Sequence, residues 1–183
     1  MVIRDADPAR DAAACAAIYA PFVANTAVSL EEEAPTAVEM SRRITATSER
    51  YPWLVAEIDG ALAGYAYASA HRDRAAYRWA ADVAVYVDDP ARRRGVGRAL
   101  FDALLTLLAQ QGVHTVCAGV TLPNDASVGL HEALGFRPVG VYQRIGYKQG
   151  AWRDVGWWQL ELAAPDDGAP AELVPPGEAL LRL

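Results

Sequence analysis

A run of arginine and glycine gives this 183-residue chain its clearest site for phosphate chemistry. The run consists of Arg92, Arg93, Arg94, Gly95, Val96, Gly97 and Arg98, and it precedes a strongly periodic helical segment. The first N–H groups of a helix have no backbone partner and carry partial positive charge. Glycine lets a phosphate approach the backbone closely, and the guanidinium group offers several donors to its oxygens. We therefore predict a phosphate-bearing ligand at this helix start.

Two common phosphate motifs do not describe the run. No Gly-Lys-Ser/Thr follows it, so it is not a Walker A loop. The glycine spacing also differs from that of the dinucleotide fingerprint, and arginine precedes the first glycine. The alternative interpretation is a basic turn that starts a surface helix and binds no ligand.

The histidines and cysteines show no metal-binding spacing along the chain. Cys15 and Cys117 form neither a C-x-x-C motif nor a zinc pattern. His114 and Cys117 have no ligand spacing with each other or with His71, so we interpret the first two as core or edge residues. We predict no metal, no disulfide framework and a reducing, cytoplasmic location. No cysteine lies in the candidate motifs, so an acyl-cysteine intermediate is unsupported.

Composition and charge exclude several classes of protein. Hydrophobic residues make up 52% and charged residues 22%, which is typical of a globular domain and not of a disordered chain. The net charge of −6 argues against a nucleic-acid surface. No apolar run approaches the ~20 residues that span a bilayer, and the first residues do not resemble a signal peptide.

Helical and extended segments alternate along the chain. Asp7 before Pro8, and Thr36 with Glu39 three residues later, are helix-start signals, while Gly112 ends the helix that follows the glycine run. Helices are predicted at residues 8–22, 36–49, 96–111 and 125–134. Strands are predicted at 53–58, 61–70, 81–87, 114–121, 136–147 and 155–162, with 27–30 either strand or loop. The order indicates an α/β or α+β fold with a partly parallel centre.

The last twenty residues differ from the rest, because they hold four of the 11 prolines. We predict one domain over residues 1–163 and a flexible tail over residues 164–183. Its final leucines, Leu180, Leu181 and Leu183, are candidates for docking on the domain.

The run at 92–98 is similar to the signature of the GNAT N-acetyltransferase superfamily, because Arg92-x-x-Gly95-x-Gly97 matches its Gln/Arg-x-x-Gly-x-Gly/Ala pattern. Segments 51–57, 64–68, 122–124, 130–136 and 154–160 resemble its phosphinothricin N-acetyltransferase branch. The resemblance spans residues 18–162. It implies the GNAT fold, a mixed and largely antiparallel splayed sheet with helices on both faces and a bulge in the strand at 83–87.

The resemblance implies acetyl-coenzyme A as co-substrate. Backbone N–H groups of residues 93–98 would hold its pyrophosphate, and the strand at 83–87 would pair with its pantetheine arm. Asn124 would contact the pantetheine end, although its position also suits a helix N-cap. The implied cofactor-binding residues are Val85, Val87, Arg92, Arg93, Arg94, Gly95, Val96, Gly97, Arg98, Asn124 and Ser127.

Two residues take catalytic roles by resemblance. His131 occupies the place of a general acid toward the leaving thiolate, although a lone histidine is by itself more often a packing residue. Asp82 stands where the branch usually has a glutamate general base that acts through water. The alternative for Asp82 is a strand-end carboxylate without a role in proton transfer.

The segment at 71–77 connects two strands and carries the implied substrate-binding residues. Arg74 and Tyr77 best match the positions that hold an acidic amino-acid-like substrate, and Arg72 is assigned to the same group. Leu30 replaces the phenylalanine that is usual in the branch and would line the same pocket. An exposed polar loop without a ligand is the alternative.

These assignments predict acetyl transfer to a small amino-acid-like substrate of the phosphinothricin or methionine sulfoximine type, by direct attack in a ternary complex. The alternatives are a protein or peptide N-terminal acetyltransferase and a coenzyme A sensor without turnover. A homodimer is implied by the resemblance, while nucleic-acid and membrane partners are not expected.

Overall fold

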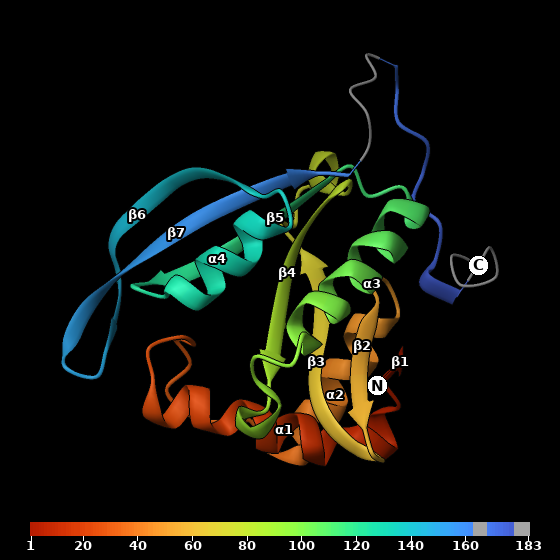
Figure 1. Ribbon diagram of the computed structural model, residues 1–183. Helices are drawn as coiled ribbons and strands as arrows, with labels where there is room; N and C mark the ends of the chain where they lie inside the picture. Colours follow the sequence, from red (N-terminus) through yellow and green to blue (C-terminus); the bar gives the residue numbers. More distant parts are fainter. Residues whose placement is uncertain (163–167, 178–183) are drawn as a thin grey trace.

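The centre of the protein is a sheet of seven strands, seen in a computed structural model that describes residues 1–162 and 168–177 (Figure 1). The strands lie in the order β1, β2, β3, β4, β5, β7, β6. Every neighbouring pair is antiparallel except β4 and β5, which run parallel. The strands are β1 (Val2–Asp5), β2 (Trp53–Ile58), β3 (Ala61–Ala70), β4 (Ala80–Val87), β5 (Thr115–Leu122), β6 (Arg137–Lys148) and β7 (Ala151–Glu161).

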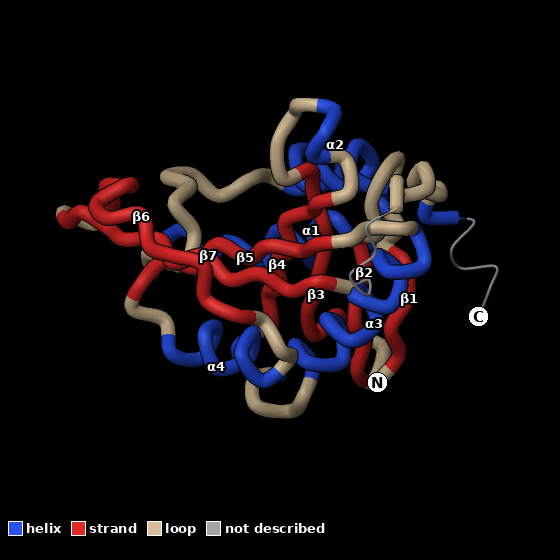
Figure 2. The backbone as a smooth tube through the Cα atoms, turned by 90° about the horizontal axis from the view of Figure 1, so that it is seen from above, coloured by secondary structure: helices blue, strands red, loops and turns tan. Residues whose placement is uncertain are grey.

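Helices cover both faces of the sheet (Figure 2). Helices α1 (Pro8–Asn25) and α2 (Ala37–Ser48) lie on one face, while α3 (Val96–Gln111) and α4 (Asp125–Ala133) lie on the other. Short 3₁₀ turns, η1 (Ala75–Tyr77) and η2 (Asp89–Ala91), precede and follow β4. The predicted fold class, a mixed and largely antiparallel sheet between helices, is therefore confirmed.

Local sequence signals placed the starts of α1 and α2 and the end of α3 correctly, whereas α1 continues three residues beyond the predicted residue 22, to Asn25. The Asp7 side chain accepts hydrogen bonds from the N–H groups of Ala9 and Arg10, and Thr36 accepts one from Glu39. Gly112 ends α3 in the left-handed conformation with φ 89°. The sequence did not predict β1, because a four-residue strand is too short to show periodicity. Residues 27–30 form a loop.

Alternation along β4 decides which face each of its side chains meets. Ala81 and Val83 join the core cluster on the α3 face, together with Leu100 and Phe101. Tyr86 packs instead against the second cluster, around Tyr19 of α1 and the inner side of α2. Because side chains alternate on a strand, Asp82 shares the α1 face with Tyr86.

Strands β4 and β5 pair over three residues only and then separate. Ala80, Ala81 and Asp82 lie opposite Thr115, Val116 and Cys117. Beyond this point β4 follows β3, while β5 follows β7 in another direction (Figure 1). The sheet therefore has a wedge-shaped opening, which begins at the Asp82–Cys117 rung.

The hairpin of β6 and β7 is tied to the loop that follows α1. Lys148 is buried, and its Nζ donates to the carbonyl oxygens of Ser29 and Glu31, both at 2.7 Å. In the described chain, no helix is long and apolar enough to cross a membrane.

The described part of the proline-rich tail contacts the domain near the end of α3. Val174 exchanges hydrogen bonds with Gln111, through its N–H and its carbonyl oxygen, and Leu173 packs against the core. Trp79 Nε1 donates to the carbonyl of Ala171. Residues 168–177 thus run along the domain, while the leucines expected to dock lie outside the described residues. The domain boundary stays a prediction.

Candidate active site

The wedge exposes one backbone edge of β4. Within the described chain, residues 83–87 have no partner on the β5 side, although β3 pairs with the opposite edge. An extended ligand that carries amide groups adds to such an edge as a strand would. The side chains of Val85 and Val87 turn toward α3. Their predicted contact with the cofactor must therefore come from their backbone groups.

Helix α3 begins beside the wedge with donors that no side chain caps. Gly95 is the N-cap residue, with φ 80° and no side-chain hydrogen bond. Val96 is 1% exposed, so only its N–H can face a ligand. Uncapped N–H groups at a helix start suit an anion, and the pyrophosphate of coenzyme A has the chemistry to meet them.

The arginines of this loop fall into two pairs. Arg93 and Arg94 are exposed and form no ion pair within the described residues, so both are free to reach phosphate oxygens. The other two are paired within the chain, Arg92 with Asp89 at 3.0 Å and Arg98 with Asp102 at 3.6 Å.

Gly97 has a packing role that the sequence did not indicate. A Cβ atom on this residue would lie 3.5 Å from side-chain carbons of Leu130 and Val87, and 3.9 Å from Val85. These are ordinary van der Waals distances, so a methyl group would just fit between α3 and its neighbours β4 and α4. A large residue here would act on that packing and not by projecting from the loop.

Asn124 caps α4, as one of its two interpretations predicts. Its Oδ1 accepts a hydrogen bond from the N–H of Ser127 at 3.2 Å. The carboxamide NH₂ is not used in this cap, so a contact from Asn124 to the cofactor stays compatible with it. The predicted cofactor contacts of Asn124 and Ser127 themselves stay predictions.

His131 lies in the core of the α3 face. The ring is 4% exposed and packs edge-on against Phe101 and Phe136. Burial lowers the pKa of His131, and Nδ1 donates to the carbonyl of Ser127 at 2.7 Å. In the neutral ring Nε2 is then an acceptor, and it is buried without a partner in the described chain. Nε2 could donate a proton to a thiolate only if the ring were protonated or in the other tautomer. The predicted role of His131 as an acid stays a prediction that depends on one of these states.

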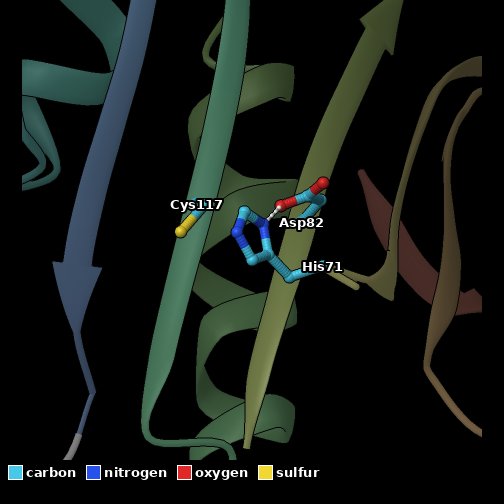
Figure 3. Close-up of side chains that lie close together, drawn as sticks. All are labelled: His71, Asp82 and Cys117. Carbon is cyan, nitrogen blue, oxygen red and sulfur yellow. Dashed lines mark hydrogen bonds and ion pairs between the residues drawn. The ribbon is translucent and has the colours of Figure 1, made fainter. Parts of the chain in front are cut away.

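Asp82 lies on the opposite face, beside two residues that the sequence did not assign to the site (Figure 3). The carboxylate Oδ1 is 2.6 Å from Nδ1 of His71, at the end of β3. Cys117 on β5 completes the group, and the ligand atoms of all three lie within 4.8 Å of one another. The structure therefore separates Asp82 from His131, the two predicted catalytic residues, and joins Asp82 to His71.

The partial burial of this group sets its charges. Burial raises the pKa of the Asp82 carboxyl, while the hydrogen bond and charge of His71 oppose that shift. Burial also raises the pKa of the Cys117 thiol to about 11, with a contribution from the charge of Asp82. The thiol is therefore protonated near neutral pH. The spacing of the three donors would admit a cation, but His71 Nδ1 and Asp82 already bond to each other, so we describe a hydrogen-bonded pair beside a neutral thiol.

The predicted substrate-binding arginines line a basic hollow next to this pair. A hollow of about 340 Å³ is bordered by Arg72, Arg74 and Tyr77, together with Arg50, Tyr51, Asp73, Ala75 and Arg78. The Tyr77 ring lies 5.8 Å from the His71 ring. Arginine forks bind carboxylate and phosphinate oxygens in pairs, so the hollow suits an acidic group.

Leu30 is placed elsewhere. It is 38% exposed, and its side chain lies against the backbone of Gly146 on β6. No contact in the described chain joins it to Arg72, Arg74 or Tyr77. Its predicted place in the substrate pocket stays a prediction.

The pairing of His71 with Asp82 was missed because the two residues belong to different strands. Ser69 lies opposite Asp82 in the β3–β4 register. His71 is two residues after Ser69, just past the end of β3, and its side chain reaches the same face as Asp82. The contact follows from the pairing of β3 with β4. The spacing of motif residues along the sequence does not indicate it.

Comparison with known proteins agrees with this architecture. An acetyltransferase (GNAT) domain model matches residues 5–157. The phosphinothricin N-acetyltransferase of Streptomyces viridochromogenes is 40% identical over 166 residues, 91% of each chain. The L-methionine sulfoximine/L-methionine sulfone acetyltransferase of Salmonella typhimurium is 35% identical over 91% of this chain and 99% of its own.

A solved structure also matches closely. The GNAT superfamily phosphinothricin acetyltransferase from Sinorhizobium meliloti, in complex with acetyl-coenzyme A, superposes with a TM-score of 0.89 at 35% identity over 93% of each chain. The resemblance seen in the sequence is thereby confirmed: with its open sheet and uncapped helix start, this chain belongs to the GNAT acetyltransferase family.

Proposed function

We propose that the protein transfers an acetyl group from acetyl-coenzyme A to the amino group of a small amino-acid-like substrate. The observation that carries the proposal is the position of the Asp82–His71 pair at the narrow end of the wedge. The uncapped start of α3 follows the other end of β4. A phosphate site and a proton acceptor thus lie at the two ends of one unpaired strand edge.

The direct reaction needs little more than this geometry. Amines are largely protonated near neutral pH, so a proton must leave before the nitrogen can attack a carbonyl carbon. The unpaired edge of β4 would hold the two reactants side by side, which is where much of the rate advantage of such a reaction arises. Acetyl-coenzyme A brings the activated acyl group, and the chain supplies position and a proton acceptor.

The basic hollow supports an acceptor that carries an acid group. Arg72 and Arg74 offer paired donors, and Tyr77 connects the hollow to His71. Relatives named for phosphinothricin and for methionine sulfoximine act on compounds of this kind.

The test is release of the coenzyme A thiol when acetyl-coenzyme A is supplied with single amino acids. We expect turnover with phosphinothricin or methionine sulfoximine and little with amines that lack an acid group. Turnover confined to peptides with free N-termini would favour a peptide N-terminal acetyltransferase. Coenzyme A binding without turnover on any amine would contradict enzymatic function.

We also propose a homodimer in the cytoplasm, without nucleic-acid or membrane partners. Six large apolar side chains on the β6–β7 hairpin are about half exposed or more, a surface that a second copy would cover. They are Val139, Val141, Tyr142, Ile145, Tyr147 and Trp152. Light scattering on the purified protein decides between monomer and dimer.

A further inference from the structure

We infer that His71 is the residue that takes the proton from the attacking amine, and that Asp82 orients His71. This inference rests on the proposed acetyl transfer and names the base for it. The arrangement is that of a carboxylate behind an imidazole, which fixes the ring and stabilises its charged form.

The geometry assigns one nitrogen of His71 to each task. Nδ1 lies 2.6 Å from Asp82 Oδ1, so the carboxylate holds the proton on Nδ1. The other nitrogen, Nε2, is then the basic atom, and it is turned toward β5 and Cys117 (Figure 3). No hydrogen bond engages Nε2 within the described residues, so an amine or a water can reach it. This atom lies at the narrow end of the wedge, where β4 and β5 stop pairing.

Asp82 is less suited to take the proton directly. Its Oδ1 is already engaged by the ring at 2.6 Å, whereas no hydrogen bond in the described chain occupies Nε2 of His71. A carboxylate that holds an imidazole orients the ring and stabilises the imidazolium that forms, without itself contacting the substrate. Asp82 is therefore a positioning residue.

Cys117 is equally unsuited to act as a nucleophile. Its thiol is protonated near neutral pH because of burial and the nearby Asp82 charge. It makes no hydrogen bond to His71 in the described chain. Asp82, His71 and Cys117 are thus arranged in the order acid, base and nucleophile of a catalytic triad. The hydrogen bond between base and nucleophile, which a triad needs, is missing.

Several other charged or titratable groups face the pair. The Tyr77 ring lies 5.8 Å from His71, and Trp157 of β7 closes the other side at 5.9 Å. Arg72 donates to the backbone carbonyl of His71, and its charge opposes protonation of Asp82. Burial raises the pKa values of Tyr51 and Tyr67, and the charge of Asp82 makes a smaller contribution in the same direction.

The step conserves atoms and charge. The substrate ammonium gives one proton to His71 Nε2, and its nitrogen then forms a bond to the acetyl carbonyl carbon. The carbon–sulfur bond breaks, and its electron pair leaves on sulfur. The nitrogen gives its second proton to that thiolate through solvent, and the imidazolium returns the first proton to water.

The test compares His71→Asn with Cys117→Ala in the full-length enzyme. Asparagine keeps a donor toward Asp82 but offers no base, whereas the cysteine variant leaves the pair intact. We expect His71→Asn to lower kcat about 10²–10⁴-fold, the usual worth of a general base. The KM for the amine and the Kd for coenzyme A should change less than about threefold. Cys117→Ala should keep kcat within about threefold.

Two further readouts separate a base from a structural residue. In the parent enzyme kcat/KM should fall at acid pH, because a protonated ring accepts no proton, and His71→Ala should lose this dependence. Added imidazole should restore part of kcat to His71→Ala in a saturable way. Asp82→Asn should still turn over without added imidazole, because His71 is present. Its kcat should be lower than that of the parent enzyme, since the ring loses its charged partner.

The outcomes are distinct. If His71→Asn keeps the parent kcat and pH dependence, Asp82 is the direct base and the inference is overturned. If Cys117→Ala is inactive and mass spectrometry finds acetylated Cys117 in the parent enzyme, the group is a nucleophilic triad. If the parent enzyme binds coenzyme A but acetylates no amine, the proposed function fails and the inference fails with it. An equal melting temperature and coenzyme A affinity in each variant shows that folding is preserved.

Discussion

Replacing the single lysine, Lys148→Met, should weaken both the fold and the binding of the amine. Methionine keeps most of the apolar stem but removes two hydrogen bonds from a charged donor, at 2.7 Å to each carbonyl. Such bonds are worth roughly 1.5–3 kcal/mol, and a buried carbonyl left without a donor loses that amount. Ser29 is 5% exposed and should lose it in full, whereas water can reach the half-buried Glu31. We therefore expect the free energy of unfolding to fall by about 2–4 kcal/mol.

Urea unfolding measures this loss, and Arg42→Met is the matched control. Arg42 is also a cation in an ion pair, but its side chain is 76% exposed, so its removal should leave the free energy of unfolding nearly unchanged. Leu30, whose place in the amine pocket is a prediction, lies between the two anchored carbonyls. If Leu30 lines that pocket, the KM for the amine should rise in Lys148→Met while the Kd for coenzyme A stays constant. A loss of stability no larger than that of the control would refute the assignment of Lys148 as the anchor of this loop.

Three further predictions concern the anion hollow, the helix start and acid stability. Arg74→Ala should lower kcat/KM about ten- to a hundredfold on an acidic acceptor but not on a neutral amine, and an equal loss on both would show that Arg74 does not bind the acid group. Gly95→Ala, at φ 80°, should cost about 1–2 kcal/mol and raise the Kd for coenzyme A in calorimetry, whereas Gly129→Ala in the open interior of α4 should do neither. Burial works to raise the pKa of Asp11, but the Arg4 hydrogen bonds help hold it below 3.8, so its stabilisation is present above that pH and is lost as the pH falls further. Asp11→Asn should flatten the acid branch of stability measured by urea unfolding; an unchanged branch would contradict this.

The fold was largely predictable because its signals are local. Helix caps at Asp7 and Thr36, and the left-handed glycine at 112, depend on a few neighbouring residues and are found where expected. The glycine run was predictable for the same reason, since a helix start is made by consecutive residues. β1 was not predicted because only its pairing with β2, about fifty residues along the chain, identifies it as a strand.

The group of His71, Asp82 and Cys117, where we infer proton transfer, was harder to predict because it depends on strand register. Asp82 was identified, but its partner His71 comes from the previous strand and Cys117 from the next one along the sheet. For His131 the sequence predicted the role but not the surroundings of the side chain. Its position in the motif predicted a role, but only packing shows that the ring lies between two phenylalanines, with Nε2 unpartnered in the described chain.

The three-residue junction between β4 and β5 has a thermodynamic consequence for the whole molecule. On one side stand β1 to β4, and on the other stand β5 to β7, with few paired rungs to make the two blocks unfold together. A ligand that bonds to β4 and reaches across the wedge acts as a missing strand. At a hundred times its Kd, such a ligand adds about 2.7 kcal/mol to the folded state. Saturation with coenzyme A should therefore slow amide exchange on residues 83–87 and 118–122 together, because the ligand adds a link between two sides of the sheet that otherwise share three rungs and the core on the α3 face.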